Sequence, residues 1–183
     1  GNIMLKKAAP FMLVYITVPA LIVALTFGGW ANLADAFVAF MLIPFAAALT
    51  SHDLSNPNEE THRLEWLFNM PLYLWVPLQV SLLVWAILES TTRTGWDFVG
   101  LAIATGLVSG AVGITIAHEL MHRKKPQERA MAEILMLAVS YPHFCIEHVY
   151  GHHKHVATPL DAATSRLGES LYGFLPRGIV NSL

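Results

Sequence analysis

The stretch that decides the fold runs from Ala117 to His155 and reads AHELMHRKKPQERAMAEILMLAVSYPHFCIEHVYGHHKH. It holds seven of the nine histidines in the chain. Most of them fall in two clusters, His118-Glu119-Leu120-Met121-His122 and Glu147-His148-Val149-Tyr150-Gly151-His152-His153. Neutral imidazole is a common protein ligand for zinc, iron, copper and nickel. The two clusters therefore predict a metal centre.

The spacing inside each cluster supports this prediction. His118 and His122 are four residues apart, so on a helix they share one face and can bind the same ion. His148 and His152 repeat that spacing, and His153 adds a third nitrogen. A catalytic zinc site usually takes about three ligands from the protein. Five candidate ligands exceed that number, which indicates either two metal ions or one site with additional histidines nearby.

The composition indicates a membrane protein. Hydrophobic residues make up 55% of the chain and charged residues only 13%, whereas ordinary soluble domains carry about 25% charged residues. The formal net charge is −2 and no basic block is present, so nothing points to nucleic acid as a partner. Cys145 is the single cysteine, which excludes an internal disulfide framework and suggests a small buried side chain.

Long apolar segments predict an all-α membrane protein with four transmembrane helices, at residues 11–27, 30–49, 66–88 and 98–117. The first segment is longer than the apolar region of a signal peptide, and another apolar segment follows it almost at once. We therefore expect a retained helix there. Gly28-Gly29 predicts a tight turn after the first helix, and residues 89–97 predict a turn after the third.

The remaining segments are polar or mixed. Residues 50–65 lack periodicity and predict a loop, so its two histidines, His52 and His62, are expected to be solvated rather than metal-bound. Residues 157–177 are expected to form ordered structure on the cytoplasmic side. The chain is thus predicted to be one membrane-embedded domain over residues 1–183, in which residues 118–183 form a cytoplasmic-side helical region around the metal.

The distribution of lysine and arginine predicts the orientation. Four crossings place the N-terminus, residues 50–65 and residues 118–129 on one side of the membrane. That side holds Lys6, Lys7, Arg63, Arg123, Lys124, Lys125 and Arg129, and the opposite side holds Arg93. Because basic residues accumulate in cytoplasmic loops, the N-terminus and the metal site are expected to be cytoplasmic.

The segment between the two clusters, residues 130–141, is apolar but only 12 residues long. As a helix it would span about 18 Å, well below the roughly 30 Å of a hydrocarbon core. A crossing would also place the two clusters on opposite sides of the membrane. The sequence therefore predicts an interfacial or buried helix that returns the chain to the same metal site.

Taken together, these motifs resemble the first two histidine boxes of the membrane alkane monooxygenases. The similarity continues in Val156-Ala157-Thr158-Pro159 and Ser165-Arg166-Leu167-Gly168-Glu169-Ser170-Leu171-Tyr172, which are similar to the stretch that follows the second box in that family. The first box would also fit the related xylene monooxygenases, and fatty-acid desaturases share histidine boxes as well.

The resemblance implies a six-helix enzyme of the bacterial inner membrane with two non-haem iron ions. Such an enzyme hydroxylates the terminal carbon of alkanes with dioxygen and electrons from rubredoxin and its reductase. The implied iron ligands are His118, His122, His148, His152 and His153, whereas His143 and His155 match no ligand position. The family carries a third histidine box and two more helices downstream, so this chain is expected to be the N-terminal part of a longer enzyme and to be incomplete by itself.

The chemistry is consistent with this reading, because an alkane C–H bond offers no polar handle and needs oxygen activated at a metal. Glu119 and Glu147 adjoin the ligands and are either hydrogen-bond acceptors for ligand N–H groups or solvated acids. The alternatives are a xylene-type methyl hydroxylase, a fatty-acid desaturase, a metal transport module, and an intramembrane zinc protease with Glu119 as general base. The zinc protease leaves the second cluster unexplained. The sequence leaves the alkane chain length and the oligomeric state open.

Overall fold

The computed structural model describes residues 12–42, 44 and 65–182, and all the regular secondary structure in these residues is helical. The predicted loop of residues 50–65, with His52 and His62, lies outside these residues except for Glu65. The chain divides into two compact units, Gly1–Ile116 and Ala117–Leu183. The boundary lies within one residue of the predicted junction between the fourth apolar segment and the histidine-rich region. The prediction of a single domain stays a prediction.

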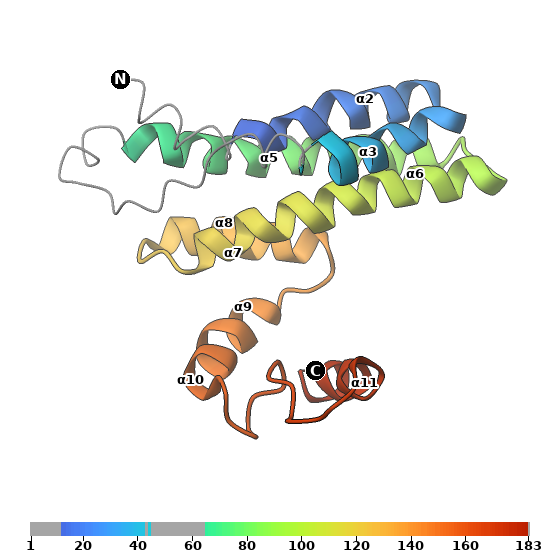
Figure 1. Ribbon diagram of the computed structural model, residues 1–183. Helices are drawn as coiled ribbons and strands as arrows, with labels where there is room; N and C mark the ends of the chain where they lie inside the picture. Colours follow the sequence, from blue (N-terminus) through green and yellow to red (C-terminus); the bar gives the residue numbers. More distant parts are fainter. Residues whose placement is uncertain (1–11, 43, 45–64, 183) are drawn as a thin grey trace. The chain divides into compact units, whose positions relative to one another are not determined.

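The first unit is a group of apolar helices in which α2, α5 and α6 lie side by side (Figure 1). Its elements are η1 (Val14–Ile16), α2 (Thr17–Phe27), η2 (Gly29–Asn32), α3 (Leu33–Phe37), η3 (Val38–Leu42), α5 (Glu65–Ser90), α6 (Gly95–Leu107) and η5 (Val108–Gly113), followed by α7 (Ile114–Met121), which crosses the boundary between the units. The core is formed by fully buried side chains that include Leu25, Trp75 and Ala104.

Two stretches are long and apolar enough to cross a membrane: Trp66–Ser90 in the first unit, and Gly95–Met121, which begins in the first unit and ends in the second. Their outer faces carry large apolar side chains as well, for example Leu74, Val84 and Ile103. A helix that is apolar on its exposed face as well as its buried face is typical of a membrane span. Val14–Phe27 is an apolar but shorter helix, and the predicted segment 30–49 is described only up to residue 42 and at residue 44. The four-crossing count therefore stays a prediction.

Polar contacts hold the two predicted turns of the first unit together. The Arg93 guanidinium donates to the carbonyl oxygen of Leu25 at 2.7 Å, and the Gly29 N–H donates to the Asp97 carboxylate at 2.7 Å. Gly28 has φ +61°, and a Cβ there would lie 1.8 Å from Nη1 of Arg93. Only glycine fits this close approach. The turns before η2 and before α6 therefore meet at one end of the unit.

The second unit contains the end of α7, α8 (Pro126–Ala138), α9 (Phe144–Ile146), η6 (Glu147–His152), α10 (His153–His155) and α11 (Leu171–Asn181). Helix α8 is the short apolar helix predicted for residues 130–141. It begins earlier because Pro126 suits the first position of a helix. It ends earlier because Ser140 adopts φ +58° and the Tyr141 N–H bonds back to the carbonyl of Met136. At 13 residues, or about 20 Å, it is too short to cross a bilayer.

Candidate metal centre

The first histidine cluster lies at the end of α7. His118 is in the last turn of that helix, and His122 is the first residue after it. The Nε2 atoms of the two rings lie 3.4 Å apart. The four-residue spacing thus brings both rings to one face, as the sequence predicted.

The second cluster is arranged differently from the predicted α-helix. Residues Glu147–His152 form a π-helical turn, in which residues five positions apart, rather than four, come together. Consequently His148 pairs with His153, and their Nε2 atoms lie 3.1 Å apart. His152 is left out of this pair. The expected pairing of His148 with His152 is the part of the local geometry that the sequence did not predict correctly.

The two clusters meet in space. The Nε2 atom of His118 lies 2.7 Å from Nε2 of His148, across 30 positions of the chain. One ligand atom from each of four histidines, His118, His122, His148 and His153, lies within 4.8 Å of the others. Nitrogens bound to a common ion at about 2.0–2.1 Å would lie roughly 3–4 Å apart. The separations in the group, from 2.7 Å up to 4.8 Å, bracket this range, so small ring movements would let the four imidazoles share a metal ion. An all-imidazole set suits iron, zinc, copper or nickel.

The electrostatics of the cluster favour the neutral form of two of its imidazoles. Burial, followed by the neighbouring imidazoles of His118 and His153, lowers the pKa of His148 to about 4. Burial, with His118 as the next cause, also lowers the pKa of His122. A neutral imidazole offers its lone pair to a metal, whereas a protonated one does not. At neutral pH His148 is therefore ready to bind an ion.

The Nδ1 atom of His152 faces a carboxylate, and His152 does not belong to the group of four converging histidines. Its Nδ1 atom lies 2.8 Å from an oxygen of Asp161. Asp161 is buried, with a relative exposure of 4%, and also accepts hydrogen bonds from the Thr164 hydroxyl and from the Ala163 N–H at 3.0 Å. Burial works to raise the pKa of Asp161, but these hydrogen bonds outweigh it and hold the pKa below its ordinary value. Asp161 therefore stays ionised.

Asp161 is the residue of this site that reasoning from the sequence missed. It stands nine positions after His152 in a turn, between the two segments that carry the family resemblance. A lone aspartate at that distance fits no ligand spacing. The sequence feature that could have pointed to Asp161 is its position between Val156-Ala157-Thr158-Pro159 and Ser165-Arg166, two segments that carry the family resemblance.

The two glutamates predicted beside the ligands lie in different surroundings. Glu119 accepts a hydrogen bond from the Arg123 guanidinium at 2.8 Å. Glu147 lines a cavity together with His148 and His152. Their role as acceptors for ligand N–H groups stays a prediction.

Two described histidines outside the predicted ligand set, His143 and His155, also lie outside the group of four. His143 stacks edge-on against Tyr141, with ring centroids 4.4 Å apart. Its Nε2 atom is buried and has no hydrogen-bond partner among the described residues. His155 is the last residue of α10.

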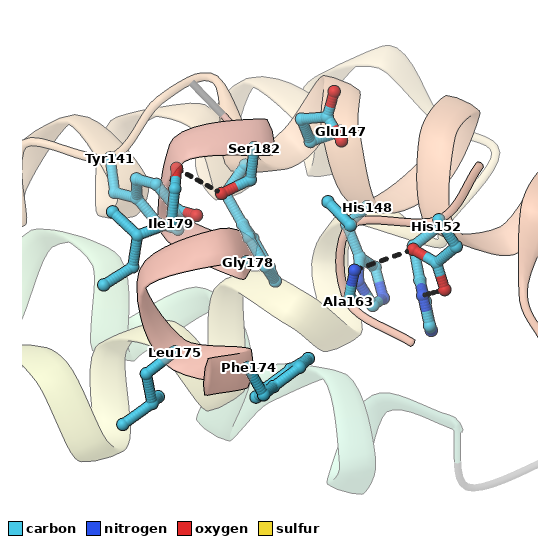
Figure 2. Close-up of a pocket in the computed structure, with 13 residues that line it drawn as sticks. Tyr141, Glu147, His148, His152, Ala163, Phe174, Leu175, Gly178, Ile179 and Ser182 are labelled. Carbon is cyan, nitrogen blue, oxygen red and sulfur yellow. Dashed lines mark hydrogen bonds and ion pairs between the residues drawn. The ribbon is translucent and has the colours of Figure 1, made fainter. Parts of the chain in front are cut away.

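A cavity of about 220 Å³ lies beside His148 and His152 (Figure 2). Figure 2 shows Phe174, Leu175 and Ile179 of α11 along its wall. Tyr141 and Phe144 contribute aromatic rings to the lining. The second cluster thus has a largely apolar flank within its own unit.

Comparison with known proteins agrees with this site. The family model described as fatty acid desaturase matches residues 94–181, which include both histidine clusters. The chain is 40% identical over 146 residues to alkane 1-monooxygenase 2 of Pseudomonas aeruginosa, covering 76% of this chain and 39% of that protein. It is 41% identical over 143 residues to alkane 1-monooxygenase 1 of Alcanivorax borkumensis, covering 75% of this chain and 35% of that protein.

A more distant relative has a different named substrate. The hydroxylase component of xylene/toluene monooxygenase from Pseudomonas putida is 31% identical over 116 residues, covering 61% of this chain and 31% of that protein. The chain spans about two fifths of the length of the alkane monooxygenases that it matches. The matched residues of the family model include both histidine clusters and the helices that carry them. With about three quarters of its length 40–41% identical to these alkane 1-monooxygenases, the chain belongs to the alkane monooxygenase family.

Proposed function

We propose that this protein is part of a non-haem di-iron monooxygenase of the membrane that hydroxylates the terminal carbon of alkanes. The observation that carries the proposal is the convergence of one ring nitrogen from each of four imidazoles within 4.8 Å, in a chain whose relatives are named alkane 1-monooxygenases. When bound, iron would supply the redox chemistry that activates dioxygen, which no protein side chain supplies alone. One oxygen atom would enter the C–H bond and the other would leave as water, with two protons from solvent and two electrons supplied through rubredoxin.

The chain's own residues would hold the metal. His118, His122, His148 and His153 would bind through the nitrogens that converge, and His152 would bind through Nε2 because its Nδ1 faces Asp161. Five imidazoles leave open positions on two ions, so further ligands would come from other residues. The apolar flank formed by Phe174, Leu175 and Ile179 would keep water away from one side of the second cluster.

The proposed topology has four crossings, with the N-terminus and the histidines on the cytoplasmic side of the bacterial inner membrane. It is supported by the two stretches that are long and apolar enough to cross a membrane and by the contact of the two turns through Arg93 and Leu25. In that topology both turns lie on the side opposite to the histidines. An alkane dissolved in the lipid would reach the protein without passing through water.

The relation to the xylene/toluene monooxygenase component favours one second candidate, a methyl hydroxylase for alkyl-aromatic substrates. A competition assay separates the two. The full-length protein in membranes, with rubredoxin and its reductase, would be given octane and xylene together. We expect iron in the protein and 1-octanol as the main product. Zinc without iron, or no oxidised product from either substrate, would refute the proposal.

A further inference from the structure

We propose that Asp161 is the positioning residue of His152, which holds the proton of that ring on Nδ1 and leaves Nε2 as the nitrogen that binds metal. The proposal rests on the proposed metal centre and deepens it. It also explains how a histidine outside the group of four can still be a ligand.

The hydrogen bonds around Asp161 determine the direction of its contact with His152. Both oxygens of the carboxylate already act as acceptors, one from the Thr164 hydroxyl and the other from the Ala163 N–H. The Nδ1 atom of His152, 2.8 Å away, must therefore be the donor. A neutral imidazole with its proton on Nδ1 has its lone pair on Nε2.

The carboxylate is held in place independently of any ion. Thr164 also accepts from the Ala157 N–H at 3.0 Å, and its carbonyl accepts from the Arg177 guanidinium at 3.0 Å. Arg177 in turn forms two hydrogen bonds of 2.7 Å with Glu169. This network ties the turn that carries Asp161 to helix α11. The position of the Asp161 carboxylate is thus fixed, and it can orient the ring of His152.

The π-helical turn explains why His152 needs such a partner. It brings His148 and His153 together, and the ring of His152 lies beside them, with its centroid 5.5 Å from that of His148 and 5.6 Å from that of His153. The His152 side chain is only partly exposed, and among the described residues no second imidazole nitrogen lies within hydrogen-bond distance of it. Metal-binding histidines commonly donate their other N–H to a carboxylate, which fixes the ring and its tautomer. Asp161 fulfils that role here.

The first test uses the unmodified protein without metal. Selective ¹⁵N labelling of histidine in the full-length protein would report the tautomer of His152 by long-range ¹H–¹⁵N correlation. We expect the proton on Nδ1. A proton on Nε2 would overturn the proposal, whatever metal the protein binds.

The second test measures metal affinity by titration with Co²⁺, followed by its absorption spectrum. Replacing a carboxylate that orients a metal-binding histidine typically weakens metal binding by about 10–100-fold. We expect that range for Asp161→Ala and a smaller loss for Asp161→Asn, whose amide oxygen can still accept from Nδ1. Ser182→Ala, which alters the same cavity away from His152, is the matched control and should bind Co²⁺ like the unmodified protein.

The decisive comparison is Asp161→Ala in a His152→Ala background. If Asp161 acts through His152, it causes no further loss of affinity once that ring is removed. An equal additional loss in the double variant would show a general structural role and overturn the proposal. If the unmodified protein binds no metal at all, the proposed function fails, while the tautomer measurement still decides the role of Asp161.

Discussion

The Nε2 atom of His118 lies 2.7 Å from the Nε2 atom of His148, although the two residues belong to different clusters 30 positions apart. His148 is also 3.1 Å from His153, so it is the shared neighbour of both clusters. Two imidazole nitrogens this close to each other are well placed to share an ion. The metal centre should therefore depend on His148 more than on any histidine at its edge.

His148→Ala should abolish metal binding by the cluster and, with it, alkane hydroxylation. The substitution removes the nitrogen that joins the two pairs. The measurement is metal content per chain after purification, together with product formation from octane. His155→Ala is the matched control, because His155 follows the same π turn but lies outside the group of four. Full metal content in His148→Ala would contradict the assignment of the second cluster.

Gly28→Ala should destabilise the first unit by about 1–3 kcal/mol, the range for a residue in a backbone region that essentially only glycine adopts. Gly28 has φ +61° and ψ −156°, and an added Cβ would also displace the Arg93 side chain. Thermal unfolding in detergent measures the effect. Gly106→Ala is the control, because a Cβ there meets nothing within 4 Å and alanine favours a helix by about 1 kcal/mol. Equal stability of the two variants would contradict the role of the turn.

Cysteine labelling should report the predicted topology. In a background with Cys145→Ser, the substitutions Asn58→Cys and Pro126→Cys should react with a membrane-impermeant reagent only from the cytoplasmic side. Thr94→Cys, next to Arg93, should react only from the opposite side. The reason is the excess of lysine and arginine on the side of the histidines. Labelling of positions 58 and 126 from different sides would rule out four crossings.

The contact between Glu169 and Arg177 should make α11 sensitive to acid. The guanidinium of Arg177, and then the N–H of Arg166, hold the pKa of Glu169 at about 2, below its ordinary value of 4.5. Because the folded state favours the ionised carboxylate, the stabilisation is complete above about pH 4.5 and is lost as the pH falls towards 2. Hydrogen exchange of the α11 amides should rise over this range. In Glu169→Gln the rise should disappear, and an unchanged pH profile in that variant would show that another group is responsible.

Several features were predictable from local patterns because they depend on the residue and its near neighbours. The two apolar spans at residues 66–88 and 98–117, the turn at Gly28-Gly29 and the short helix after Pro126 depend on hydropathy, backbone freedom and helix length. The metal-binding character of the histidine clusters depends on the chemistry of imidazole. The boundaries of α8 were less predictable, since they depend on the left-handed conformation of Ser140.

The sequence by itself determined that the chain is helical, that it belongs in a membrane and that two histidine clusters bring imidazoles to one place. Only the tertiary structure decided which imidazoles pair. Because residues 147–152 form a π-helical turn, His148 pairs with His153 and not with His152 as expected. The spacing of the histidines in the sequence does not show whether the turn is α-helical or π-helical. The tertiary structure also decided that Asp161 contacts the Nδ1 atom of His152. That contact requires the segment after α10 to fold back, where the Arg177 side chain of α11 donates a hydrogen bond to the carbonyl oxygen of Thr164. Because these residues are far apart in the chain, no local sequence pattern predicts the contact.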